Sequence, residues 1–389
     1  DKRRLNLNAE WVPEGCRLTE EGELVGTPRP TRIASFWMEG PAAAYQTWQS
    51  LAEKLRAAEE LYENTGSQET LKSVINTDWG RPYIRRVGKN SRSSERLMDR
   101  AEQTEKRTVP DGVRFLTAAI DVQGGKERRF VVQVHGWGVG RECWVVDRFN
   151  IKEDLSVEPP RRINPGANPE DWDVLTRDVL SRCYPLDDGS GRFMQIAMVA
   201  ADSGGEEGVT FQAYAWYRRL RQLGLHKRLM LIKGASTKTS TPLRETYPDS
   251  TNRKDRKAGS RGDVPVWQLG TDVLKDAVAA MLDREEPGAN YLHVPSWLGR
   301  WWYEELTYEV RGADGKWRKP GKGNNESFDL GVYNLAAFLR LGGERINWDA
   351  PPAWAREWNA NPLVQASEDT PPEPVRTTRR RRTRLQIKR

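Results

Sequence analysis

Three aspartates in this chain lie at positions from which their carboxylates could bind a shared cation. Asp121 ends an apolar run in FLTAAIDVQGG, and Asp202 ends a second run in MQIAMVAADSGG. Asp329 lies early in the segment NNESFDLGVYNLAAF. Taken singly, the first two are most simply turn residues, and the third an acid that favours the positive end of a helix dipole. The repetition of the pattern suggests a shared site.

If the three carboxylates converge, their mutual repulsion raises their pKa values unless cations lie between them. Oxygen ligands select Mg²⁺ or Mn²⁺, and two such ions held by shared carboxylates activate a water and stabilise the leaving oxygen in phosphodiester cleavage. The sequence therefore predicts Asp121, Asp202 and Asp329 as catalytic ligands of two Mg²⁺ or Mn²⁺ ions. We expect the glycines after both strands to leave room for a DNA backbone.

The elements that position these acids are predicted from hydrophobic periodicity between residues 109 and 345. Three strand-like runs separated by glycine-rich turns, at 114–122, 128–138 and 141–151, indicate an antiparallel meander. The continuous apolar run before Asp202 is typical of a strand buried on both faces. Helical patterns cover residues 168–184, 208–224, 271–282 and 325–341. These patterns predict an α/β fold with a mixed sheet flanked by helices.

Composition shifts divide the chain into three predicted regions. Residues 1–108 contain irregular sequence, a helical stretch at 45–75 and a charged linker. Residues 109–345 form the predicted nuclease domain, and residues 346–389 are Pro-rich and then basic, which predicts a disordered tail.

Several classes of protein are disfavoured by composition. No segment reaches the roughly 18 consecutive apolar residues of a membrane span, so we expect no membrane association. The chain begins Asp1-Lys2-Arg3 without an apolar signal core. Its three cysteines are far apart, which argues against structural zinc and fits reduced thiols in a cytosol. We therefore expect an intracellular protein.

Positive charge is concentrated at the carboxyl terminus. Residues 376–389 hold eight Arg and Lys and no acid, whereas the whole chain has a net charge of +7, so the remainder is nearly neutral. The tail is predicted to contact phosphates or an acidic protein surface; the alternative is a solvated tail that only aids solubility. Its arginines include Arg379, Arg380, Arg381, Arg382 and Arg384.

The order of elements resembles the RNase H-like fold. More narrowly, the sequence resembles the lambda-type large terminase subunit of tailed phages. Across residues 109–338, the resemblance rests on VPDGVRFLTAAIDVQGG, VHGWGVGRECWVVDRFNI, ADSGG, LIKGAS, WQLGTDVLKDAV, LTYE and NNESFDLGVYNLAAF, which follow the family's order. Upstream, ASFWMEG, TWQSLAEKL and LKSVINTDWGRPY resemble the stretch that joins the family's ATPase domain to its nuclease, which implies that residues 1–108 are a remnant of the ATPase-side region and a linker. The resemblance covers roughly residues 30–345. It implies an endonuclease that cuts concatemeric viral double-stranded DNA during packaging, in the host cell cytoplasm. The implied partners are the small terminase subunit and the portal protein of the procapsid.

The resemblance also implies roles for individual residues. Asp121 would bridge two metal ions, and Asp202 and Asp329 would each bind one. Glu326, three residues before Asp329, would support the metal ligands without binding a metal itself. Lys233 and Lys275 would face phosphates, or would be ordinary surface lysines.

One departure from the family concerns its motor. The chain contains no phosphate-binding loop G-x-x-x-x-G-K-[ST]. We therefore expect no ATP hydrolysis from this chain alone.

Two alternatives to a packaging nuclease remain open at this stage. The first alternative is a non-catalytic module that docks the packaging motor on the portal and DNA. The second is another RNase H-like enzyme, such as a resolvase or transposase. The long polar loop at 236–262 and the linker at 81–107 are basic enough to contact a duplex backbone under any of these interpretations.

Overall fold

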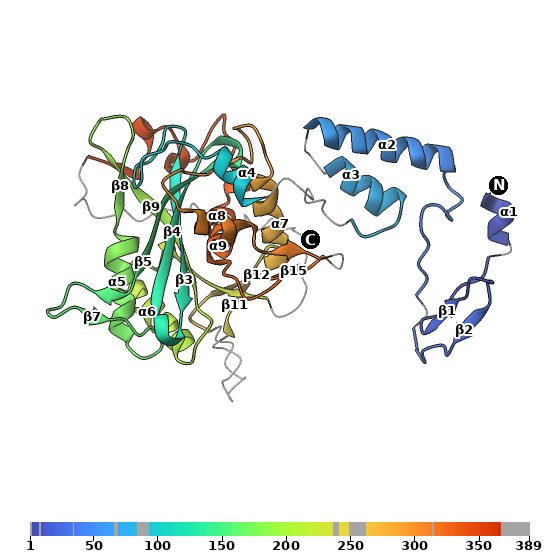
Figure 1. The fold of residues 1–389 in the computed structure, drawn as a ribbon, viewed down its shortest axis with the longest axis horizontal. Helices are drawn as coiled ribbons and strands as arrows, with labels where there is room; N and C mark the ends of the chain where they lie inside the picture. Colours follow the sequence, from blue (N-terminus) through green and yellow to red (C-terminus); the bar gives the residue numbers. More distant parts are fainter. Residues whose placement is uncertain are drawn as a thin grey trace, which may run out of the picture. The chain divides into compact units, whose positions relative to one another are not determined.

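The computed structural model describes residues 2–7, 9–33, 35–65, 69–83, 93–235, 241–248, 262–312 and 315–366. The chain forms two compact units, Asp1–Arg86 and Val87–Arg389 (Figure 1). The expected boundary after residue 108 therefore lies too late in the sequence. Residues 93–108 belong to the second unit because their side chains and backbone bond to it. Arg100, for example, donates to the carbonyl oxygens of Leu292 and Leu282.

The first unit is mainly helical. Its elements are α1 (Lys2–Leu7), β1 (Cys16–Leu18), β2 (Leu24–Gly26), α2 (Trp48–Thr65), α3 (Glu69–Ser73) and η1 (Val74–Asp78). Ala58, Leu71 and Val74 form a small buried cluster between the helices. The helical stretch predicted at 45–75 is thus present, divided into three segments.

The second unit is built on one large mixed sheet. Within the described ranges its strand order is β11-β12-β10-β9-β3-β4-β5-β13, and β8 and β16 also pair with β9. The principal strands are β3 (Phe115–Gln123), β4 (Arg129–Trp137), β5 (Cys143–Ile151), β9 (Phe193–Asp202) and β10 (Leu229–Gly234). The shorter ones are β8 (Cys183–Pro185), β11 (Leu243–Thr246), β12 (Val266–Leu269), β13 (Leu292–His293) and β16 (Val364–Gln365).

The register of the central strands confirms the predicted meander. β3 pairs antiparallel with β4, and β4 pairs antiparallel with β5. β9 then returns beside β3 in parallel, and β10 pairs in parallel with β9. The apolar runs of β3 and β9 are buried along nearly their whole length, as expected for strands covered on both faces.

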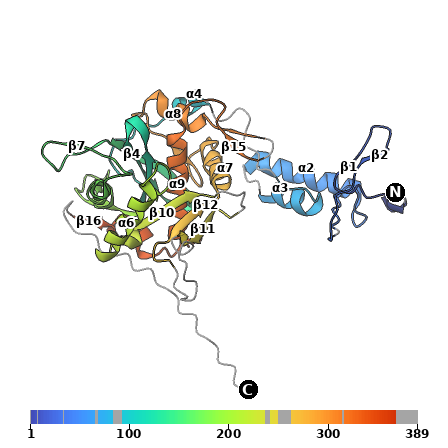
Figure 2. The ribbon, with the colours of Figure 1, turned by 90° about the horizontal axis from the view of Figure 1, so that it is seen from below.

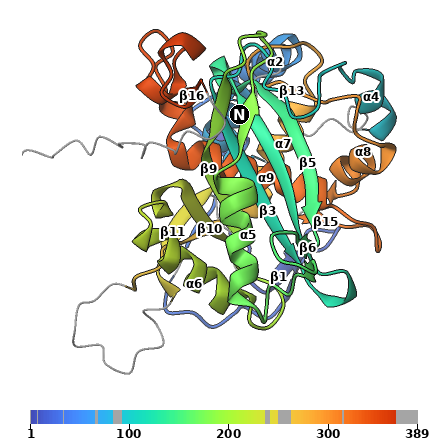
Figure 3. The same cartoon turned by 90° about the vertical axis from the view of Figure 1, so that its left-hand side faces the viewer.

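Helices cover both faces of this sheet. One face carries α5 (Asp173–Leu175) with its flanking turns η4 (Pro169–Trp172) and η5 (Thr176–Leu180), together with α6 (Val209–Gln222) (Figure 3). The other face carries α7 (Thr271–Leu282), α8 (Arg300–Thr307) and α9 (Glu326–Leu341), with α9 against β3, β4 and β9. Helices α7 and α9 also pack against each other (Figure 2). The helices predicted at 208–224, 271–282 and 325–341 are present. The helix predicted at 168–184 ends at Leu180, and its last two residues belong to β8.

Residues 346–366 differ from the prediction of a disordered tail. β16 pairs with the start of β9. The Trp354 ring meets the Phe115 ring edge-on at 4.9 Å, and the Trp358 indole donates to the carbonyl oxygen of Val113. Pro-rich composition suggested disorder, but the large apolar side chains of this stretch supply enough buried surface to hold it on the sheet. The basic residues 376–389 lie outside the described residues.

Three further short elements complete the second unit: α4 (Ser94–Asp99), the hairpin β6 (Glu153–Asp154) with β7 (Arg161–Arg162), and the hairpin β14 (Val310–Arg311) with β15 (Trp317–Arg318). None of the helices in the described part of the chain has the length and apolarity needed to cross a membrane.

Candidate active site

Two of the three aspartates lie side by side at one edge of the sheet. In the parallel pair β3–β9, Ile120 is opposite Ala201. Asp121 and Asp202 are the next residues of their strands, and side chains alternate between the faces of a sheet. Both carboxylates therefore point to the same face, at the carboxyl ends of neighbouring strands.

That face is the one covered by α9. Thr117 is on the same side of β3 as Asp121, and its hydroxyl donates to Asn334 of α9 at 2.7 Å. Ala119 packs against Leu330 of the same helix. Asn334 also donates to the backbone oxygen of Gln133 in β4, which fixes the position of α9 across the meander.

The third aspartate enters from the amino end of α9. Asp329 lies in the first turn of the helix, where a carboxylate is stabilised by the helix dipole. Its Oδ1 is 2.9 Å from the ammonium of Lys275 on α7. Its Oδ2 accepts a hydrogen bond of 2.7 Å from the Asn325 amide. Asn325 is the N-cap residue of α9, and its side chain makes no capping bond to the helix.

The three acids influence one another electrostatically. Burial raises the pKa of Asp121 to about 7, with a further contribution from the charge of Asp202 and smaller ones from Asp329 and Glu326. The side-chain amide of Gln123 opposes this rise by donating to Asp121. Burial also raises the pKa values of Asp202 and Asp329 above their usual range. β3, β9 and α9 thus place the three predicted carboxylates close enough for the charges of Asp202 and Asp329 to raise the pKa of Asp121.

The donor chemistry of this cluster suits a hard divalent cation, because carboxylate oxygens are the ligands that Mg²⁺ and Mn²⁺ prefer. The side chains are nevertheless not arranged around a common point. Among the residues that the structure describes, no group of three or more His, Cys, Asp and Glu is placed to hold a metal ion. Asp329 is engaged by Lys275 and Asn325, which directs its carboxylate toward α7.

The two lysines predicted to face phosphates have different surroundings from those expected. Lys275 is only 8% exposed and lies between the carboxylates of Glu309 and Asp329. Burial alone would lower the pKa of Lys275, but these two charges outweigh it and raise the pKa. At this exposure Lys275 is not the ordinary surface lysine of the alternative, and its role as a phosphate contact stays a prediction. The periodicity of the helix placed Lys275 correctly on α7 but did not reveal its partners.

Lys233 extends toward the opposite face of the sheet. Its ammonium donates to the Thr210 hydroxyl of α6 at 3.0 Å and lies 6.0 Å from the Tyr214 ring centroid. Its charge still counteracts the rise in the pKa of Asp202.

Glu326 is held by two arginines from the meander. Arg129 of β4 is 2.6 Å from one carboxylate oxygen, and Arg148 of β5 is 3.6 Å from the other. Arg148 is buried and also interacts with the charge of Asp121. The sequence did not reveal either arginine as part of the site, because arginines in strands carry no distinctive spacing. Glu309 was also missed, although it ends the quoted segment LTYE.

Local packing and backbone conformation favour glycine at positions after the two strands, independently of any DNA. A Cβ on Gly124 would lie 2.6 Å from the Glu206 carboxylate, and Gly205 has a positive φ of 110° that favours glycine. The clearance for DNA that we expected from these glycines stays a prediction.

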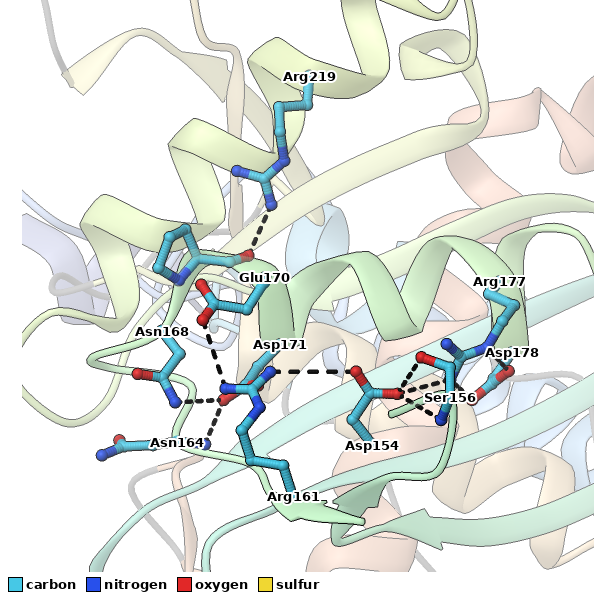
Figure 4. A network of polar contacts seen from close by, with 11 residues as sticks. Asp154, Ser156, Arg161, Asn164, Asn168, Glu170, Asp171, Arg177, Asp178 and Arg219 are labelled. Atoms are coloured by element: carbon cyan, nitrogen blue, oxygen red, sulfur yellow. Dashed lines mark hydrogen bonds and ion pairs between the residues drawn. The ribbon is translucent and has the colours of Figure 1, made fainter. Parts of the chain in front are cut away.

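A separate polar network follows β5 and provides a contrast to the aspartate cluster (Figure 4). Asp154 accepts from the Ser156 hydroxyl at 2.7 Å and pairs with Arg177 at 3.3 Å. Arg161 pairs with Asp171 at 2.6 Å. These bonds lower the pKa of Asp154, mainly through Ser156. Each acid here has a matching donor, which is typical of a structural network joining the β6–β7 hairpin to η4 and η5.

The predicted DNA-contacting segments are only partly visible. The tail arginines Arg379, Arg380, Arg381, Arg382 and Arg384 lie outside the described residues, as does most of the loop at 236–262. Their role stays a prediction.

Comparison with known proteins identifies the family. Residues 33–348 match the family model described as terminase large subunit gpA, endonuclease domain. The chain belongs to this family. It is 26% identical over 355 residues to the large terminase subunit of Escherichia phage lambda, covering 87% of this chain and 48% of that protein. It is 26% identical over 377 residues to the large terminase subunit of Enterobacteria phage P21, covering 88% of this chain and 50% of that protein.

The chain therefore spans about half the length of these curated relatives. Among solved structures, it is similar to the large terminase of a thermophilic bacteriophage. The likeness has a TM-score of 0.35 at 14% identity over 73% of this chain and 52% of that one. For the same terminase in complex with ADP, the TM-score is 0.32 at 15% identity over 62% and 44% of the two chains. The membership of the family rests on the sequence matches.

Proposed function

We propose that this chain is a metal-dependent endonuclease that cuts concatemeric viral double-stranded DNA during genome packaging. The observation that carries the proposal is the placement of Asp121 and Asp202 on one face, at the ends of adjacent parallel strands, with Asp329 entering from α9. Membership of the endonuclease family supports it. The topology also supports an RNase H-like fold, since the meander is followed by a parallel strand beside β3 and by a late helix across it.

In this proposal Asp121, Asp202 and Asp329 would hold two Mg²⁺ or Mn²⁺ ions. Bound there, these ions would lower the pKa of the attacking water and neutralise the leaving oxygen. The chain's own contribution is to keep Asp121 and Asp202 buried on adjacent strands, where the charge of Asp202 disfavours ionisation of Asp121 in the absence of a cation. Glu326, fixed by Arg129 and Arg148, sets the position of the first turn of α9 and thereby that of Asp329.

Membership of the terminase family supports a proposal for the substrate and the protein partners of this chain. The proposed substrate is double-stranded DNA, and the proposed partners are the small terminase subunit and the portal protein. The basic residues 376–389 are proposed to bind phosphates or an acidic face of such a partner.

Cleavage of a plasmid with Mn²⁺ tests the proposal. Asp121→Asn and Asp202→Asn should each reduce the cleavage rate at least about a hundredfold, because a neutral amide is a weak ligand for a hard cation. The matched control is Asp154→Asn, which removes a buried carboxylate from the network in Figure 4 and should leave cleavage nearly unchanged. Wild-type cleavage by Asp121→Asn would disprove the proposed site.

A further inference from the structure

The ion pair between Lys275 and Asp329 is the feature of the site that the proposed function leaves unexplained. A proposed metal ligand is here engaged by a protein cation at 2.9 Å. The same ammonium is 2.7 Å and 2.8 Å from the two oxygens of Glu309, a second carboxylate. Lys275 thus has two acidic partners, although one is enough to balance its charge.

The two partners differ in depth. The Asp329 side chain is 24% exposed, whereas those of Lys275 and Glu309 are 10% and 4% exposed. Glu309 therefore anchors the ammonium from the buried side, and Asp329 meets it at the accessible side. A buried ammonium that lost its only partner would incur a large desolvation cost. With Glu309 in place, Lys275 remains paired when the Asp329 carboxylate turns away.

Asn325 provides the same arrangement for hydrogen bonds. Its amide nitrogen donates to Glu309 and also to Asp329 Oδ2. If Asp329 leaves, Asn325 retains its bond to Glu309. Lys275 and Asn325 both hold Asp329, and each also has Glu309 as a second acceptor. Neither buried donor would therefore lose its last partner if the Asp329 carboxylate moved away.

The surroundings of this pair are rigid. Neighbouring Asp276 on α7 is 2.7 Å from the Arg311 guanidinium of β14 and accepts from the Trp317 indole of β15 at 2.8 Å. The Trp317 backbone N–H donates to Asp272 at the start of the same helix. These bonds fix α7 relative to the β14–β15 hairpin, and Glu309 holds the Lys275 ammonium through both of its oxygens.

We propose that Lys275 is a positioning residue that holds Asp329 in the metal-free protein and remains with Glu309 when Asp329 turns to bind a divalent cation. This inference rests on the proposed function. It explains why the described residues contain no assembled metal-binding group although the three acids are neighbours. Lys275 and the cation compete for the same carboxylate, so the Lys275–Glu309 pair sets the cation concentration at which the site assembles.

The competition predicts opposite effects for two substitutions of this pair. Lys275→Met removes the competitor and should tighten Mn²⁺ binding. Glu309→Gln leaves Lys275 with Asp329 as its remaining carboxylate partner. It should weaken Mn²⁺ binding by about tenfold or more, because a buried ammonium that loses one partner depends more strongly on the other. A merely structural role would weaken binding in both variants, because both would disorder the site.

The test measures Mn²⁺ binding to the whole chain, without DNA, by electron paramagnetic resonance of the free ion. A double-mutant cycle of Lys275→Met and Glu309→Gln separates exchange from simple charge effects. If Glu309 acts through Lys275, Glu309→Gln should change the affinity less than about threefold in the Lys275→Met background, because the two sites are coupled. If Lys275→Met fails to fold, as judged by circular dichroism, Lys275→Gln removes the same charge and keeps a donor to both acids.

Two outcomes overturn the inference. Additive effects in the cycle, or weaker Mn²⁺ binding in both single variants, would show that Lys275 does not compete for Asp329. Asp121→Asn separates these failures from failure of the proposed function. If it abolishes Mn²⁺ binding while the cycle is additive, the inference alone is wrong. If it binds Mn²⁺ as the wild-type chain does, the proposed metal site is wrong and the inference falls with it.

Discussion

Substitution of Asp121 by Asn should stabilise the metal-free chain at alkaline pH. Burial and the charge of Asp202 raise the pKa of Asp121 from 3.8 to about 7. The folded state then holds this proton between pH 4 and 7 while the unfolded state does not, so the free energy of unfolding falls as the pH rises through that window. About three pKa units correspond to roughly 4 kcal/mol above pH 7. Asn carries no charge and can still accept from Gln123, so it avoids this cost.

Urea denaturation in EDTA, followed by tryptophan fluorescence, measures the effect. Asp121→Asn should be more stable than the wild-type chain by up to about 4 kcal/mol at pH 8, and by only about 1 kcal/mol at pH 4.5. Asp154→Asn is the matched control of opposite sign, because hydrogen bonds lower the pKa of that buried carboxyl. Its substitution should destabilise the chain at pH 8. Equal stability of Asp121→Asn and wild-type chains at pH 8 would refute the argument that Asp121 is a buried, repelled carboxylate.

Two further predictions concern the elements around the site. Asn334→Leu should lower the free energy of unfolding by about 1–3 kcal/mol, because Thr117 and the Gln133 carbonyl lose their buried partner. Urea denaturation measures this change, and an unchanged midpoint would show that α9 is held by apolar packing alone. A chain ending at residue 366 should keep the melting temperature of the full chain. A chain ending at residue 345 should melt several degrees lower, because it loses β16 and the contact of Trp354 with Phe115. Calorimetry distinguishes the two chains, and equal melting temperatures would contradict the placement of residues 346–366 on the sheet.

Much of the sheet could be predicted from the sequence because its signals are local. The alternating and continuous apolar runs, the glycine-rich turns and the helical stripes located β3, β4, β5, β9 and α9 to within a few residues. Composition was a weaker guide. Pro-rich sequence after residue 345 suggested disorder, but its aromatic side chains pack on the sheet. The boundary between the units was also displaced, because the bonds of Arg100 to the second unit leave no mark in a charged linker.

The candidate site divides in the same way. Asp121 and Asp202 were found because each ends an apolar run. Side chains alternate along a strand with a period of two residues, which places both carboxylates on one face once the strands are neighbours. Glu309 and the two arginines at Glu326 were not found, since their roles depend on partners far away in the sequence. The pairing of Lys275 with Glu309 and Asp329 was not predicted for the same reason.

The sequence by itself determined which residues form strands and helices, where each acid falls within its element and which family the chain resembles. These properties depend on side chains a few positions apart. Only the tertiary structure decided that α9 lies on the face of Asp121 and Asp202, and that Lys275 on α7 meets Asp329 on α9. Such contacts join residues 54 positions apart in the chain. They are set by how α7 and α9 pack on the sheet, and the periodicity of either helix carries no record of its neighbour.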